Sequence, residues 1–167
     1  MSLDLTQLVF PNNVVELIAT RFEVIDPALL TVFRRGLRVQ DPNYSIGVSA
    51  VDWAPVPNSM EMMGVDHSRA STIEQYLLSV EAFVKMEDEE EALIAHSVIS
   101  KTIRTILASD VPLRTQLGGL TCTFNGETER LKRWWVHRAR YHSKNISGTN
   151  MYATINDVML EVEKVTA

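Results

Sequence analysis

The longest regular feature of this sequence is an amphipathic helix, predicted from about Glu87 to Ala108. Its first turns carry consecutive carboxylates, which favour the positive N-terminal end of a helix. Because apolar residues then recur at helical spacing, the helix is expected to pack one face against a sheet formed by the rest of the chain. The residues of that face are Ala92, Ala95, Ile99, Ile103 and Ile106.

Segments on both sides of this helix have the alternation of a half-buried strand. The stretch from Thr72 to Lys85 favours a strand, although its pattern does not exclude a helix. Further strands are predicted over Tyr44–Trp53, Leu120–Phe124, Thr128–Tyr141 and Tyr152–Val165, with turns at Asn125-Gly126 and Asn145–Asn150.

Three other segments favour shorter helices. The first follows a cap at Asn12 or Asn13 and continues through Phe22. The second is predicted from Asp26, with Pro27 in its first turn, to a stop at Gly36. A third begins at Asp110-Val111-Pro112 and ends at Leu117.

These elements predict an α+β fold in a single domain over residues 1–167. Residues 1–40 would form a helical N-terminal segment, and residues 44–165 a sheet-plus-helix core. The sheet is expected to be mixed or mostly antiparallel, with about four to five strands, flanked by the long central helix and the N-terminal helices.

Composition narrows the classes of function. The net charge of −5 argues against a general nucleic-acid binder, which is usually basic. Cys122 is the single cysteine, so no internal disulfide can form, and the chain fits a reducing compartment. No apolar run is long enough for a membrane helix, and no secretory signal follows Met1. We therefore expect a protein that is used in the cytoplasm or built into something assembled there, without membrane contact.

Catalytic signatures are absent from the sequence. There is no phosphate-binding glycine loop, dinucleotide fingerprint or nucleophile elbow, and no histidine stands at a zinc spacing. Cys122 lies in an alternating apolar strand, where a packing role is expected. We therefore predict no enzyme, no cofactor and no metal. The enzymatic alternative is a small metal-dependent hydrolase or nuclease using Glu61, Asp66 and His67.

The most unusual stretch is the basic and aromatic strand from Thr128 to Lys144. Arginines mixed with tryptophans are typical of protein interfaces, and also of surfaces that bind single-stranded nucleic acid. A plain core strand with one solvated basic face is the third possibility. The interface candidates here are Arg130, Arg133, Trp134, Trp135, Arg138 and Arg140.

Two further segments are candidates for docking on a partner. The acidic helix start could meet a basic surface, although a merely solvated helix end has the same pattern. A methionine-bearing segment has no clean period and could serve as an adaptable apolar contact or as core filling. The candidate residues are Glu87, Asp88, Glu89 and Glu90 in the first segment, and Met60, Met62 and Met63 in the second.

The order of these elements resembles the tail terminator proteins of long-tailed (siphovirus-type) bacteriophages, especially those infecting actinobacteria. The resemblance rests on the strand ending in Val51-Asp52-Trp53-Ala54-Pro55, the strand Tyr76–Val84, the helix through Ala95–Lys101 and the final long strands. It extends from about Asn12 to Val165. The segment Asp26–Gly36 is additional to the family's pattern.

The resemblance implies a structural virion protein without catalytic residues, located at the head–tail junction and assembled in the host cytoplasm. Such proteins form a ring, usually of six copies, that caps the tail tube, stops its polymerisation and joins it to the head connector. The implied partners are further copies of the chain, the major tail tube protein and the connector or stopper protein, while DNA passes through without specific binding. The alternatives are a head completion (stopper) neck protein and a nucleic-acid binding module.

Overall fold

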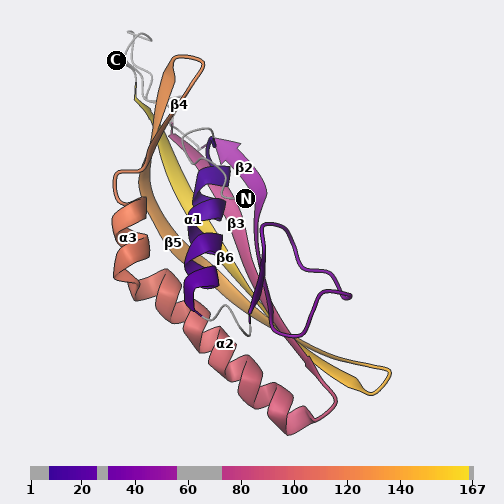
Figure 1. Ribbon diagram of the computed structural model, residues 1–167. Coiled ribbons are helices and arrows are strands. Elements are labelled where there is room, and N and C mark those ends of the chain that lie inside the picture. Colours follow the sequence, from indigo (N-terminus) through magenta and orange to yellow (C-terminus); the bar gives the residue numbers. More distant parts are fainter. Residues whose placement is uncertain (1–7, 26–29, 56–72, 166–167) are drawn as a thin grey trace.

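The computed structural model describes residues 8–25, 30–55 and 73–165 (Figure 1). The α+β class is confirmed, and the described residues contain six strands rather than four to five. The elements are α1 (Asn12–Ile25), β1 (Thr31–Phe33), β2 (Ser45–Pro55), β3 (Ile73–Met86), α2 (Glu89–Ser109), α3 (Val111–Leu117), β4 (Thr121–Phe124), β5 (Glu127–Ile146) and β6 (Thr149–Val165).

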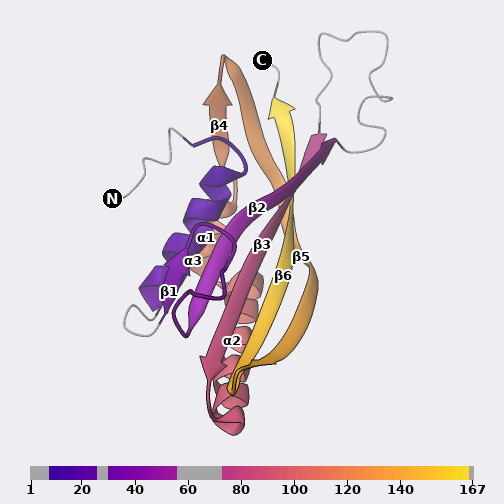
Figure 2. The same ribbon diagram turned by 90° about the vertical axis from the view of Figure 1, so that its right-hand side faces the viewer.

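The six strands form one mixed sheet in the order β1-β2-β3-β6-β5-β4. β1 runs parallel to β2, and every other neighbouring pair is antiparallel. The two views show an elongated, twisted sheet with α1, α2 and α3 on one face (Figures 1 and 2). We call this the helix face and the opposite one the outer face.

The core lies between the helix face and the three helices. Alternate residues of β3, from Leu78 to Val84, are fully buried, as expected for a strand with one face against a core. They join Ile18 and Phe22 of α1 and Ile103 of α2 in one apolar cluster. The core stripe predicted for the long helix is confirmed at most of its positions, because Ala92, Ile99, Ile103 and Ile106 are all buried.

Asp110 joins three elements at the end of α2. It is the C-cap of α2 and the N-cap of α3, where its side chain accepts a hydrogen bond from the Leu113 backbone N–H. Arg21 of α1 binds the same carboxylate through both of its oxygens, at 2.7 and 2.8 Å. The Arg21 guanidinium holds the pKa of Asp110 below its usual value. The predicted short helix is confirmed, and Asp110 ties it to α1.

The predicted second helix, Asp26–Gly36, is wrong over its described part. Thr31–Phe33 forms the short strand β1, which pairs with Ser45–Gly47. Its β-branched and aromatic residues favour extended backbone, and β2 offers them hydrogen-bond partners. Arg34 binds Glu16 and Glu23 of α1 instead of closing a helix.

Both predicted hairpin turns are confirmed, and each has two residues with positive φ, as tight hairpins require. Asn125 and Gly126 join β4 to β5. Ser147 and Gly148 join β5 to β6, so these strands run closer to the turn than the sequence predicted.

None of the described helices is both long and apolar enough to span a bilayer.

Candidate subunit interfaces

The outer face of the β5–β6 hairpin carries a row of ion pairs, which we call the ion-pair ladder. Arg130 binds Glu163 at 2.8 Å, and Arg133 binds Glu161 at 2.7 Å. Arg138 and Arg140 share the Asp157 carboxylate, at 3.1 and 2.9 Å. All four arginines predicted as interface residues are thus brought onto one face and bound to carboxylates of β6.

Two bulges in β5 produce this arrangement. The register with β6 shifts between Leu131 and Arg133 and again between Val136 and Arg138, which leaves Lys132 and His137 as the extra residues. Arg133 therefore lies opposite Glu161, and Arg138 lies opposite Asp157.

The ladder arginines cover the carboxylates they bind. Asp157 and Glu161 are only 3% and 5% exposed, whereas the side chains of Arg133 and Arg138 are 64% and 60% exposed. A buried carboxylate needs paired charge and hydrogen bonds, and the guanidinium groups supply both. The exposed edges of the guanidiniums remain accessible to a partner.

The two predicted tryptophans lie on opposite faces of the sheet. Trp134 pairs across the sheet with buried Leu160 and packs against the core. Trp135 pairs with Met159 on the outer face, where the Arg133 guanidinium carbon lies 4.9 Å from the centroid of its ring. Only Trp135 therefore presents an aromatic surface beside the ladder.

The acidic start of α2 is exposed, and two of its members have local roles. Asp88 caps the helix by accepting a hydrogen bond from the Glu91 backbone N–H, and Glu89 accepts one from the Tyr152 hydroxyl at 3.2 Å. Glu87 and Glu90 are exposed. Among the described residues no ion pair joins this acidic run to the ladder arginines.

A second exposed surface of α2 was not predicted from the sequence. Leu93, Ile94 and Val98 are 45%, 59% and 62% exposed, and Ile94 and Val98 lie one turn apart, opposite the buried stripe of the helix. These apolar residues lie at helix positions outside the predicted core stripe. Their position is the sequence signal that indicates an exposed apolar surface on this helix. Together they form what we call the α2 apolar patch.

The α2 apolar patch borders a groove of about 360 Å³ between α2 and the end of α1. Val98 lies in both the patch and the groove, and Ile25 closes the α1 side. The other groove residues are Leu30, Tyr44, Ala95, Ile99 and Thr102.

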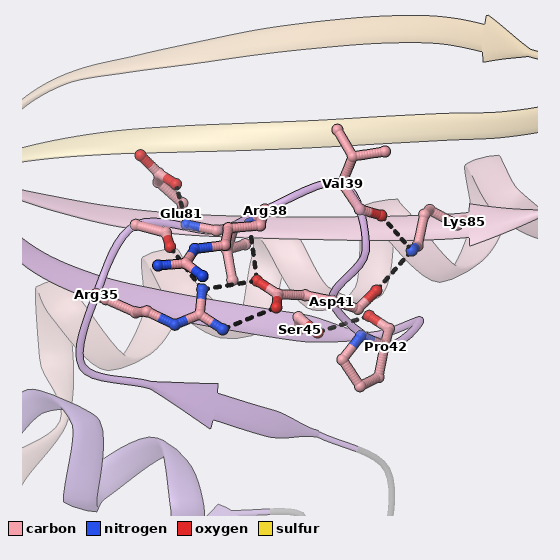
Figure 3. Close-up of polar contacts among 10 residues, drawn as sticks. Arg35, Arg38, Val39, Asp41, Pro42, Ser45, Glu81 and Lys85 are labelled. Atoms are coloured by element: carbon pink, nitrogen blue, oxygen red, sulfur yellow. Dashed lines mark hydrogen bonds and ion pairs between the residues drawn. The ribbon is translucent and has the colours of Figure 1, made fainter.

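The connection from β1 to β2 covers part of the outer face, where it contacts β3. Arg35 binds Asp41 at 2.8 and 2.9 Å and holds the loop closed (Figure 3). The Glu81 and Lys85 side chains of β3 bind loop backbone groups, at the N–H of Leu37 and the carbonyls of Val39 and Asp41. The guanidinium of Arg35 lowers the pKa of Asp41 to about 2.

Polar groups inside the fold fasten α2 to β6. His96 Nε2 lies 2.6 Å from the Thr154 hydroxyl, and Ser100 lies 2.7 Å from the same hydroxyl. Burial lowers the pKa of His96.

Burial also raises the pKa of the Cys122 thiol, which lies 3.8 Å from Glu129.

The remaining candidates give no assembled metal site within the part of the chain that the structure describes, where no group of three or more His, Cys, Asp or Glu side chains could share an ion. His137 and His142 are exposed on β5. The predicted residues Met60, Glu61, Met62, Met63, Asp66 and His67 lie outside the described residues.

Comparison with known proteins finds similarity to solved structures. No protein-family model and no curated protein matches the sequence. A solved structure titled "Virion of native gene transfer agent (GTA) particle" contains a similar chain, with a TM-score of 0.41 and 11% sequence identity. The similarity covers 90% of the present chain and 94% of that chain.

Proposed function

We propose that this protein is a structural subunit of a bacteriophage-type virion, and more narrowly a tail terminator. In this proposal about six copies form a ring on the end of the tail tube at the head–tail junction. The ring stops tube polymerisation and joins the tube to the head connector, while DNA passes through it. Its chemistry is association, without catalysis or a cofactor, and its assembly takes place in the host cytoplasm.

One observation supports this proposal most directly: two unlike exposed surfaces lie on opposite sides of one sheet. The helix side carries the α2 apolar patch of Leu93, Ile94 and Val98. The outer side carries the ion-pair ladder with Trp135 beside it. A closed ring is built from head-to-tail contacts between two different patches, whereas a two-fold dimer pairs one patch with itself.

The ladder offers a second, electrostatic contact between neighbouring copies. Its arginines keep exposed guanidinium edges, and the acidic run Glu87–Glu90 of another copy could meet them. Because the arginines already bind β6 carboxylates, such a contact would determine orientation more than affinity. The narrower assignment to a tail terminator rests on the sequence resemblance.

Polymerisation of the tail tube protein of the same virion tests this assignment. When the present protein is added in excess to polymerising tube protein, electron micrographs are expected to show shorter tubes with one capped end. Unchanged tube length and bare tube ends would contradict the terminator assignment. A ring that binds only the head connector would indicate the stopper, and salt-sensitive binding of single-stranded DNA by a monomer would indicate the nucleic-acid module.

A further inference from the structure

The groove beside the α2 apolar patch is lined mainly by apolar side chains, and the charged residues near it lie in a neighbouring hollow, where Arg21 and Asp110 pair with each other. Ile25, Leu30 and Val98 supply aliphatic walls, and Val98 is 62% exposed. A second hollow continues the groove along α2 and shares Ile25 and Val98 with it. Lys101 lines this continuation and has no ion-pair partner among the described residues.

The chain itself contains a segment with matching chemistry. Residues 56–72 connect β2 to β3 and carry Met60, Met62 and Met63, with Glu61 between the first two. Methionine side chains adapt to irregular apolar grooves, because they are unbranched and polarisable. A carboxylate flanked by methionines also suits a groove whose continuation carries an unpaired lysine.

Chain length prevents this segment from reaching the groove of its own subunit. Tyr44 lines the groove just before β2 begins, whereas the segment starts after Pro55 at the other end of that strand. The 11 residues of this strand separate Tyr44 from Pro55 by about 36 Å at roughly 3.3 Å per residue. Met63, eight residues beyond Pro55, reaches at most about 27 Å from it.

The segment must also return to its starting end. Pro55 pairs with Glu74 of β3, so both limbs of the connection leave the same end of the sheet. A two-residue turn would suffice to join strands in this register, yet the chain has 17 residues there. The surplus is enough chain for contact with a neighbouring molecule.

We propose that residues 56–72 of one copy dock in the groove of the next copy, with Met60, Met62 and Met63 against Ile25 and Val98 and with Glu61 near Lys101. This inference rests on the proposed self-assembly and specifies its contact. Donor segment and acceptor groove lie at opposite ends of β2, so each copy donates at one end and accepts at the other. Such contacts are head-to-tail and can close into a ring.

Cysteine cross-linking between full-length chains tests this contact. In a Cys122→Ser background, one chain carries Met62→Cys and the other Val98→Cys, and the two are mixed with and without tube protein and treated with a short bismaleimide. A docked segment raises the local thiol concentration, so cross-linked dimer is expected at about tenfold or more over the control. The control replaces Val98→Cys with Val111→Cys, because Val111 is exposed on α3 outside the groove.

The outcomes separate this inference from the proposed function. When one chain carries both substitutions, a series of cross-linked dimers, trimers and larger oligomers supports the head-to-tail contact. A cross-link within one monomer overturns it. Rings that form without a Met62–Val98 cross-link above the control also overturn the inference and leave the proposed function intact. A specific cross-link in open chains that never close into rings supports the inference and contradicts the ring.

A charge substitution gives an independent measurement. Val98→Asp is expected to raise the protein concentration needed for assembly by about tenfold or more, because it introduces a carboxylate into the apolar contact. Val111→Asp should leave the assembly unchanged. Equal behaviour of the two variants would remove the groove from the interface.

Discussion

Two adjacent tryptophans of β5 face opposite sides of the sheet and therefore have different roles. Trp134 packs against the core, and Trp135 lies on the outer face beside Arg133. Alternation puts neighbours on opposite faces, but the bulges at Lys132 and His137 decide which tryptophan faces the core.

Alanine substitution should separate these two roles. Trp134→Ala is expected to reduce the free energy of unfolding by on the order of 2–3 kcal/mol, because it removes a ring that packs against the buried core cluster. Trp135→Ala should change stability by less than about 1 kcal/mol and weaken assembly instead. Urea unfolding and light scattering measure the two effects. Equal loss of stability in both variants would contradict the assigned faces.

A second residue-scale prediction concerns acid stability. Burial lowers the pKa of His96 below its ordinary value of 6.5, so the folded protein keeps the imidazole neutral beside Thr154 and Ser100. The unfolded chain takes up this proton near pH 6.5. Stability from the neutral histidine is therefore fully present above that pH and is lost as the pH falls towards the lower, folded pKa.

The matched variant is His96→Gln, which cannot titrate. The free energy of unfolding of the wild-type protein should fall more steeply with decreasing pH below about 6.5 than that of the variant. Denaturant titrations between neutral and mildly acidic pH measure this difference. Parallel pH profiles would show that His96 has the same pKa folded and unfolded.

At the scale of elements, the β1–β2 connection depends on the absence of a side chain at Gly47. A Cβ atom there would lie 2.5 Å from the backbone carbonyl oxygen of Arg35 and 2.9 Å from the Leu37 side chain. The loop that Lys85 and Glu81 hold against β3 would have to shift.

Gly47→Ala is therefore expected to lower stability by about 1–3 kcal/mol through overpacking. Gly36→Ala in the same loop is the control, since its Cβ would have no neighbour closer than 3.9 Å. Urea unfolding of both variants provides the comparison. A Gly47→Ala protein as stable as the control would mean that the loop lies farther from β2.

Much of the element order could be predicted from local patterns. The long helix, the Asp110 cap and the Asn125-Gly126 turn each depend on residues close in sequence, and all three are confirmed. Strand β1 was missed because Asp26-Pro27 is a strong helix start signal, whereas the pairing of Thr31–Phe33 with β2 is a tertiary contact.

The candidate interface was predicted in part. The basic residues of β5 could be identified from the sequence, but their β6 partners depend on the bulges, which only the register with β6 determines. The exposed patch of Leu93, Ile94 and Val98 depends on how α2 is rotated over the sheet. The pairing of the arginines with β6 has no local sequence signature, whereas the patch has a weak one, namely apolar residues outside the core stripe of the helix.

At the scale of the whole molecule, we propose that unlike surfaces at opposite sides and ends of one sheet allow each copy to bind the next. An apolar patch and groove lie on the helix side, and the ion-pair ladder lies on the outer side. Surfaces of this kind generate closed rings when the rotation between neighbours closes. We therefore expect the protein to form a closed homo-oligomer.

Absolute mass across a concentration series, with electron microscopy of the heaviest species, tests this claim most directly. We expect a single closed ring of about six copies, either for the protein alone or after addition of tail tube protein. A strict monomer at every concentration, with and without tube protein, would contradict it.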